Sequence, residues 1–268
     1  MGKKKTNGSI FLVLILTLII VAACTKKTEV QQKNDNQITD NSLINVKKRG
    51  KLIIGAIPDY PPMEYIDENG DHVGYDIDVV KEIASQLGVD SEIKQIMWGD
   101  LFNAVKSGEV DLIISSITIT QERQQEMLFS VPYFDAGQTI VVQKNTKDIS
   151  SPGDLKGKKI GVNAGTTCEK IALEYANNED VIGYPGYDPI INDLKNNEID
   201  AMVTDLIGAS NYVKNNPDLK LVGEPFTQEF YGIATKLGNN ALMEEIDRIL
   251  RNMKRSGKLK EIKNKWLK

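Results

Sequence analysis

Short apolar runs and helical apolar patterns alternate along this chain. Strands are predicted by runs rich in β-branched and aliphatic residues, at residues 51–57, 110–114, 139–142, 159–162, 201–204 and 219–222. Helices are predicted where apolar residues recur three and four positions apart, at residues 77–87, 98–107, 168–177, 190–196, 208–215 and 242–253. This alternation predicts an α/β fold with mostly parallel sheets.

Polar residues and glycines indicate where some of these elements begin and end. Asp76 stands just before the first helical pattern and is expected to be its N-cap, and Gly88 is expected to end that helix. Residues 67–70, Asp-Glu-Asn-Gly, predict a tight turn.

The N-terminal pattern is of a different kind. Residues 3–5 are all Lys and precede an apolar run at residues 10–23. As a helix this run reaches only about 21 Å, short of the roughly 30 Å hydrocarbon core of a bilayer, so a secretory signal peptide over residues 1–23 is expected. Residues 21–24, Val-Ala-Ala-Cys, resemble a bacterial lipobox, which implies cleavage before Cys24 and attachment of lipid, such as palmitate, to it. The alternative is an ordinary signal peptide with an incidental Cys.

The remaining chain predicts a tether and two lobes. Residues 25–42 contain two aliphatic side chains, too few to form a core, so residues 24–42 are expected to be a lipidated Cys and a flexible tether. About 225 residues follow, which suit two α/β lobes better than one. We expect crossings between the lobes near residues 133–137 and 229–233, with lobe 1 at 43–134 plus 231–268 and lobe 2 at 138–228.

Composition and charge exclude several classes of function. The 268-residue chain has a formal charge of -4, and loss of the first 23 residues leaves 30 basic and 37 acidic side chains, a charge of -7. A net acidic protein does not suit the phosphate backbone of nucleic acids. Two Cys and one His are too few for a disulfide framework or a Cys/His zinc cluster. We therefore expect no metal and no cofactor, and expect Cys168 to be a free thiol.

Residues 115–123, SSITITQER, are the most informative stretch. They follow the predicted strand at 110–114, and ligands bind beyond the carboxyl ends of parallel strands. Arg123 is the only Arg between residues 50 and 247, and its planar guanidinium suits a carboxylate. The alternative is a surface Arg behind a polar loop.

Several separated motifs, in one order, give the chain a resemblance to bacterial extracellular solute-binding proteins of family 3. The motifs are PDYPPMEY at 58–65, GYDIDV at 74–79, SGEVDLIISSITITQERQQEMLFSVPY at 107–133, LKGKKIGVNAGTT at 155–167 and EIDAMVTD at 198–205. The resemblance runs from about Leu52 to the C-terminus. It implies a two-lobed, periplasmic-binding-protein-like (type II) fold with two mixed or parallel sheets joined by a two-strand hinge.

In lobe 1, the resemblance places the ligand carboxylate at Arg123 and at the backbone amide and hydroxyl of Thr118. It places the ligand ammonium at the backbone carbonyl of Ser116, beside Ser115. Tyr60 and Trp98 fall where members of the family sandwich the ligand side chain; the alternative for Trp98 is a cover over the core.

In lobe 2, the resemblance assigns the ligand ammonium to Asp205 and the carboxylate to the amides of Thr166 and Thr167, which stand before a predicted helix. For both assignments the alternative to ligand binding is a role in the local structure of a helix start. Thr166 and Glu169 also fit a capping box, and Asp205 also fits an N-cap.

The far end of the pocket is assigned to Asn163 and Ala164. Members of the family that bind cationic amino acids often carry an acid at the position of Ile57. Its absence here favours a polar, neutral ligand such as glutamine or cystine, although acids from other loops would admit a cation. Asp59 lies near that position but aligns with it poorly.

The function implied is that of a substrate-binding lipoprotein of an ABC-type importer, which captures an L-amino acid between two lobes and delivers it to a permease with ATPase subunits. The protein would be a monomer, anchored by lipid to the cell membrane on its extracytoplasmic face, and not an enzyme. One alternative is a ligand-sensing module for a signalling partner. Another is a cyclohexadienyl dehydratase-like enzyme, disfavoured because the one His, His72, lies in a predicted exposed turn and no nucleophile–base pair is visible.

Overall fold

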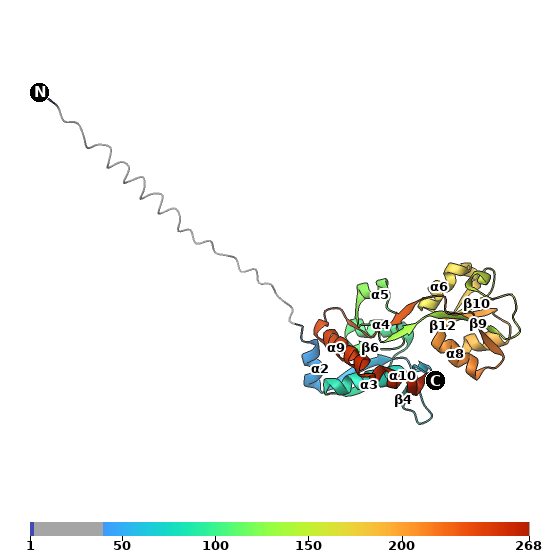
Figure 1. Cartoon of the computed structure of the whole chain (residues 1–268), viewed down its shortest axis with the longest axis horizontal. Helices are drawn as coiled ribbons and strands as arrows, with labels where there is room; N and C mark the ends of the chain where they lie inside the picture. The colour runs from blue at the N-terminus through green and yellow to red at the C-terminus, as the bar shows by residue number, and fades with distance from the viewer. Residues whose placement is uncertain (3–39, 268) are drawn as a thin grey trace. The chain divides into compact units, whose positions relative to one another are not determined.

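The computed structural model describes residues 1–2 and 40–267, and the chain from Asp40 onward forms one compact unit. Most of the predicted signal peptide, Cys24 and most of the predicted tether fall at residues 3–39 and lie outside the described residues. Within the compact unit, two five-stranded sheets each carry their own helices, and a short two-stranded sheet connects them (Figure 1). The predicted fold class is confirmed.

Lobe 1 is built on a sheet with strand order β5-β1-β6-β15-β7. Its strands are β1 (Lys51–Ala56), β5 (Asp90–Gln95), β6 (Leu112–Ile113), β7 (Met127–Phe129) and β15 (Ala234–Lys236). Its helices are α2 (Ser42–Arg49), α3 (Tyr75–Leu87), α4 (Trp98–Ser107), α5 (Gln121–Glu126), α9 (Asn240–Ser256) and α10 (Lys258–Trp266). A small sheet adds β2 (Asp59–Tyr60), β3 (Glu64–Ile66) and β4 (His72–Val73).

Lobe 2 is built on a sheet with strand order β11-β10-β12-β9-β13. Its strands are β9 (Gln138–Gln143), β10 (Ile160–Asn163), β11 (Val181–Tyr184), β12 (Ala201–Asp205) and β13 (Leu219–Val222). Its α-helices are α6 (Thr167–Tyr175), α7 (Tyr187–Lys195) and α8 (Leu206–Asn215), and short 3-10 helices lie at Pro152–Leu155 and Asn178–Asp180. The strand β12 is buried along its whole length, which explains why residues 201–203 are all apolar instead of alternating with polar residues.

The connection between the lobes is the antiparallel pair β8 (Phe134–Ala136) and β14 (Glu229–Tyr231). These strands lie in the two segments where the sequence predicts crossings. Phe134 and Tyr231 stack with ring centroids 5.6 Å apart and belong to the main hydrophobic cluster. Two strands with packed aromatic side chains suit a hinge, and the exact lobe boundaries stay a prediction.

The helical patterns of the sequence correspond to buried faces. On α9 the buried residues include a stripe made of the apolar residues of the helix predicted at 242–253. They are Leu242, Ile246, Ile249, Leu250 and Met253. Helix α3 ends at Gly88, whose left-handed backbone (φ 75°) lets its N–H reach the last carbonyls of the helix.

The N-cap prediction for Asp76 is wrong. Helix α3 begins at Tyr75, two residues before the predicted start, and its N-cap is Gly74 at φ 127°. A Cβ at Gly74 would lie 2.2 Å from the Met63 carbonyl oxygen, so this close backbone approach requires glycine. Asp76 is instead fully buried, and its carboxylate bonds side chains and backbone distant in sequence.

The expectation of mostly parallel sheets holds only in part. In lobe 1, β1 runs parallel to β5 and β6, whereas β15 runs antiparallel to β6 and β7. In lobe 2, β9 runs antiparallel to β12 and β13. The antiparallel strands are those next to the crossings, where the chain enters or leaves a lobe.

Some elements carry no clear sequence pattern. Strand β5, Asp-Ser-Glu-Ile-Lys-Gln, lies at the edge of its sheet and is only half-buried, so it has no apolar run. His72 was expected at an exposed turn; it lies half-buried in β4, just after the predicted turn, in which Gly70 donates to the Asp67 carbonyl.

Candidate functional site

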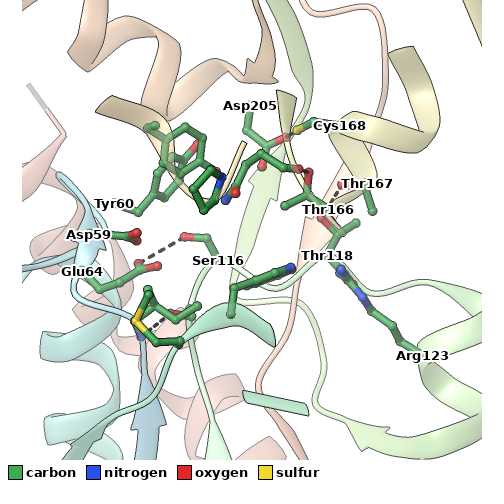
Figure 2. A pocket seen from close by; sticks show the side chains of 17 residues that line it. Asp59, Tyr60, Glu64, Ser116, Thr118, Arg123, Thr166, Thr167, Cys168 and Asp205 are labelled. Carbon is green, nitrogen blue, oxygen red and sulfur yellow. Dashed lines mark hydrogen bonds between the residues drawn. The ribbon is translucent and has the colours of Figure 1, made fainter. Parts of the chain in front are cut away.

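All ten residues expected to bind the ligand line one cavity between the lobes (Figure 2). They are Tyr60, Trp98, Ser115, Ser116, Thr118, Arg123, Asn163, Thr166, Thr167 and Asp205. Ala164, expected beside Asn163, is exposed and does not line the cavity. Lining residues that the sequence did not predict are Ile57, Asp59, Glu64, Met97, Cys168, Pro185 and Tyr187. The structure thus brings the predicted set together, and binding by these residues stays a prediction.

The sheets explain why these residues meet. Ser115 to Thr118 follow the carboxyl end of β6, Asn163 ends β10 and Asp205 ends β12. Parallel strands present their carboxyl ends at one edge of a sheet, where loops from several strands converge. Each lobe directs that edge toward the cavity, so residues distant in sequence share one lining.

Arg123 is held in place by carbonyl and aromatic groups. Its Nη1 donates to the Thr118 carbonyl oxygen at 2.8 Å, and its guanidinium carbon lies 5.5 Å and 5.0 Å from the ring centroids of Trp98 and Phe102. Burial lowers the pKa of Arg123, but an Arg side chain keeps its charge in proteins. No carboxylate of the described residues forms an ion pair with it. The cation is therefore oriented and available to an anion.

A buried carboxylate, Glu229 of β14, organises the hydroxyl groups near Arg123. It accepts hydrogen bonds from Thr118 Oγ1 at 2.8 Å, from Thr167 Oγ1 at 3.2 Å and from Gln138 Nε2 at 2.6 Å. The Thr118 hydroxyl therefore donates to Glu229 and is not free to donate to a ligand in this arrangement. Glu229 was expected only as part of a crossing between the lobes.

The N-terminus of α6 does not form the predicted capping box. Thr166 is the N-cap residue, but its hydroxyl donates to the Asn163 carbonyl at 2.7 Å. Glu169 accepts from the Gly165 amide at 2.7 Å instead. The side chains thus shape the loop before the helix, and the first amides of α6 lack side-chain caps.

Asp205 is buried, and its carboxylate accepts hydrogen bonds from groups outside helix α8, which it precedes. It accepts from the Tyr231 hydroxyl and from the Cys168 thiol, with Sγ 3.7 Å away. Burial and the nearby Glu229 carboxylate raise the pKa of Asp205 to about 7. Asp205 occupies the N-cap position of α8, as its alternative role predicted, but its side chain makes no capping bond.

A cluster of three acidic side chains lies at the end of the cavity away from Arg123. Glu64 is 2% exposed, Asp76 is fully buried behind it, and Asp59 stands nearer to solvent. Burial and the neighbouring Asp76 raise the pKa of Glu64 well above its usual value, and burial raises the pKa of Asp76 to about 6. Figure 2 shows Asp59 and Glu64 on the side of the cavity away from Arg123.

The two lobes touch across the cavity. Tyr60 of lobe 1 stacks on Tyr187 of lobe 2 with ring centroids 4.9 Å apart, and Trp98 Nε1 donates to the Gly165 carbonyl at 3.3 Å. At the surface, Lys170 of α6 pairs with Glu122 of α5. The enclosed volume is about 50 Å³, room for a few water molecules. Entry of a solute the size of an amino acid therefore requires the lobes to move apart.

Trp98 contacts both the cavity and the core. It lines the cavity and also packs edge-on against Phe102, at the border of a lobe 1 hydrophobic cluster. Both interpretations made from the sequence are therefore compatible with its position. Tyr60 also lines the cavity and packs against Tyr187.

The described residues offer neither a group of side chains arranged for a metal ion nor a helix long and apolar enough to cross a bilayer.

Comparison with known proteins agrees with the fold. Residues 52–268 match the family described as bacterial extracellular solute-binding proteins, family 3. The L-cystine-binding protein TcyJ of Escherichia coli (strain K12) is 32% identical over 85% of this chain and 86% of its own length. The ABC transporter glutamine-binding protein GlnH of Bacillus subtilis (strain 168) is 32% identical over 97% of this chain and 96% of its own. A solved ancestral arginine-binding protein bound to glutamine superposes with a TM-score of 0.78 at 43% identity, covering 82% of this chain and 98% of that one.

Proposed function

Because this chain belongs to the bacterial extracellular solute-binding proteins of family 3, we propose that it is the substrate-binding subunit of an ABC-type amino-acid importer. Relatives named for cystine and glutamine, and a similar structure that holds glutamine, support an amino acid as the ligand. One observation carries the proposal: Arg123 of lobe 1 and Asp205 of lobe 2 line the same cavity.

The two charges suit the two ends of an amino acid. A zwitterion loses much hydration energy when it leaves water, so each end needs a fixed partner. Arg123 and the amides of Thr118 and Thr167 would take the carboxylate. Asp205 would take the ammonium, and the positive charge would lower the pKa of Asp205 from about 7 and ionise it.

Ligand capture would couple to movement at β8 and β14. Because the predicted contacts come from both lobes, the ligand binds the closed arrangement more strongly than an open one and shifts the population toward it. A closed, loaded receptor would then deliver the amino acid to the permease.

We also propose a lipid anchor at Cys24 on the extracytoplasmic face of the cell membrane. The support is the sequence Val-Ala-Ala-Cys after the apolar run. In cells, Cys24→Ser should release the protein from the membrane fraction and abolish incorporation of labelled palmitate. Continued membrane attachment of the Cys24→Ser chain would contradict the anchor but not the binding function.

A thermal-shift screen tests the binding function. The purified chain is heated with each of the twenty amino acids, cystine or ornithine. A ligand present at one hundred times its dissociation constant adds about 2.7 kcal/mol to the free energy of unfolding, which raises the melting temperature by several degrees. D-enantiomers serve as matched controls, and a chain that responds to none of the L-amino acids does not have the proposed function.

A further inference from the structure

A second hollow lies on lobe 1, against the strands that connect the two lobes. Its volume is about 440 Å³, and it shares no lining residue with the cavity between the lobes. Sites for small molecules span roughly 300–1,000 Å³. We propose that this hinge hollow binds a small anion with a flat apolar body, and that its occupation favours the closed arrangement of the lobes.

The walls of the hinge hollow come from three helices and from both connecting strands. Helices α3, α9 and α10 pack on one another (Figure 1) and contribute Tyr75, Leu250 and Leu259 to its lining. Strands β8 and β14 contribute Phe134 and Phe230. Phe230 is 37% exposed and therefore offers an apolar ring to a ligand.

Positive charge gathers around this apolar wall. Lys254 of α9 and Lys260 and Lys263 of α10 line the hollow, and none of them forms an ion pair with a carboxylate of the described residues. A fourth cation, Arg251, already pairs with an acid of its own helix. The one acid among the described lining residues is Asp135. In a chain whose formal charge is -4, three ammonium groups thus lack a counter-charge that an anion would supply.

The helix dipoles do not explain all three lysines. Lys254 and Lys263 lie in the last turns of α9 and α10, where a cation is favourable. Lys260 is the third residue of α10, close to the positive end of that dipole, so its position is unfavourable for the helix alone. An anion in the hollow would offset that cost.

The combination of lining groups defines the class of ligand. Lys263 Nζ lies 5.0 Å from the ring centroid of Phe134, so charge and apolar surface adjoin within the hollow. A bare inorganic anion would leave the ring of Phe230 in water, whereas an uncharged ring would leave the lysines without a counter-charge. A phosphate or carboxylate group attached to a planar ring satisfies both. The anionic surface of a lipid bilayer is broad and would not fill a hollow of this size.

The position of the hinge hollow couples it to movement of the lobes. Phe134 and Phe230 belong to the paired strands β8 and β14, in which Phe230 is the register partner of Asp135. A ligand that touches both strands and the lysines of α10 fits one relative position of strands and helices. The structure has that position with the lobes in contact. Such a ligand binds the closed arrangement more tightly and shifts the population toward it.

Isothermal titration tests the site with two probes, adenosine 5′-monophosphate for a phosphate head and indole-3-acetate for a carboxylate head. We expect at least one probe to bind at least tenfold more tightly than its separate parts, which are inorganic phosphate and adenosine, or acetate and indole. Binding should weaken as the salt concentration rises, because the lysines are exposed.

Variants locate the binding. Lys263→Gln and Phe230→Ala should each weaken binding of the probe at least fivefold. The matched controls are Lys48→Gln, an exposed cation of α2, and Tyr175→Ala, whose side chain is also 37% exposed. Both control variants should bind the probe normally.

Cys168 reports closure, because it lines the cavity between the lobes and not the hinge hollow. In a Cys24→Ser chain without amino acid, a saturating probe should slow alkylation of Cys168 by a maleimide at least threefold. Lys263→Gln should reduce this effect at the same probe concentration. If the proposed function also holds, the probe should raise the affinity for the amino acid, and the amino acid should raise the affinity for the probe by the same factor.

Three results overturn the inference: neither probe binds more tightly than its parts, Lys263→Gln and Phe230→Ala bind like the controls, or alkylation of Cys168 keeps its rate with the probe bound. Binding to vesicles of phosphatidylglycerol, without binding of either free probe, also overturns it in favour of a membrane contact. The binding and alkylation measurements need no amino acid, so their failure leaves amino-acid capture standing. A thermal screen without any response would remove amino-acid capture and leave the hinge hollow.

Discussion

The hydroxyl groups of Thr118 and Thr167 come from opposite lobes and lie 3.4 Å apart, and both donate to the carboxylate of Glu229. Glu229 belongs to β14, the strand that returns the chain to lobe 1. One buried acid therefore holds together the loop that carries Thr118, the start of α6 and the connecting strands. The position of the predicted carboxylate site is fixed by a residue that need not touch the ligand.

Replacement of Glu229 should destabilise the closed arrangement. Glu229→Gln keeps the size but replaces one acceptor oxygen with an NH2 group, which faces existing donors. Loss of hydrogen bonds to a buried charged acceptor costs about 1–3 kcal/mol, so urea melts should show a free energy of unfolding lower by that amount. Glu224→Gln, an exposed acid nearby in sequence, is the control; equal stability of the two variants would contradict the role of Glu229.

Arg123→Ala should abolish ligand binding. The ligand carboxylate would lose its cationic partner inside a closed site, a cost of about 3–5 kcal/mol by analogy with broken buried ion pairs. Isothermal titration with the amino acid found in the screen measures the loss. Arg248→Ala, on the exposed side of α9, should bind normally, and retained affinity in Arg123→Ala would remove Arg123 from the site.

Gly208→Ala should keep the lobes from closing fully. A Cβ at Gly208 of α8 would lie 2.4 Å from the Tyr60 hydroxyl oxygen, and the stacking of Tyr60 on Tyr187 leaves that ring little freedom to move. We expect ligand affinity to fall at least tenfold while the melting temperature of the free protein falls little, since alanine favours helix. Gly99→Ala in α4, where the Cβ meets open space, is the matched control. Unchanged affinity in Gly208→Ala would show that this contact does not limit closure.

The stability of the ligand-free protein should fall as pH rises from about 4 to 7. Burial raises the pKa of Asp205 to about 7 and that of Asp76 to about 6, above the unfolded value near 4. The folded state therefore binds more protons than the unfolded chain in this window, and each such group removes up to about 1.4 kcal/mol per pH unit. Thermal melts from pH 4.5 to 8 measure the slope, and Asp205→Asn should flatten it. Stability that rises through this range would contradict the protonated state of these acids.

Cys168 should report on the opening of the cleft. Its thiol is buried in the cavity wall, and burial raises its pKa, so little thiolate forms at neutral pH. In a Cys24→Ser chain, alkylation of Cys168 by a maleimide should be slow in the native protein and at least tenfold faster in urea. With saturating ligand it should be slower than in the ligand-free native protein. A ligand that leaves the native labelling rate unchanged would contradict binding in this cavity.

The sequence predicted the framework of the fold through local patterns. The buried stripe of α9 and the glycine end of α3 depend on neighbouring residues only, and such signals can be read from one chain. The strand pairing that makes β9 antiparallel depends on where the chain enters lobe 2, which no local pattern records.

The site was predicted unevenly for a related reason. Arg123 was noticed as the only Arg between residues 50 and 247, and the family resemblance then supplied its role and those of Thr118 and Asp205, whose motifs are continuous in sequence. The Glu64–Asp76 pair was missed because its members lie on different elements, and Asp76 had a satisfactory local explanation as a helix cap. Burial of both carboxyls together becomes visible only after the small sheet packs on α3.

The ion pair between Glu122 and Lys170 has a consequence outside the cavity. Both side chains are largely exposed, so their attraction weakens as dissolved salt increases, and its worth is at most about 1 kcal/mol. Because this exposed ion pair joins the two lobes, we expect the population of the open arrangement to increase as the salt concentration rises. If the proposed function holds, the affinity for the ligand would then vary with the salt concentration around the cell.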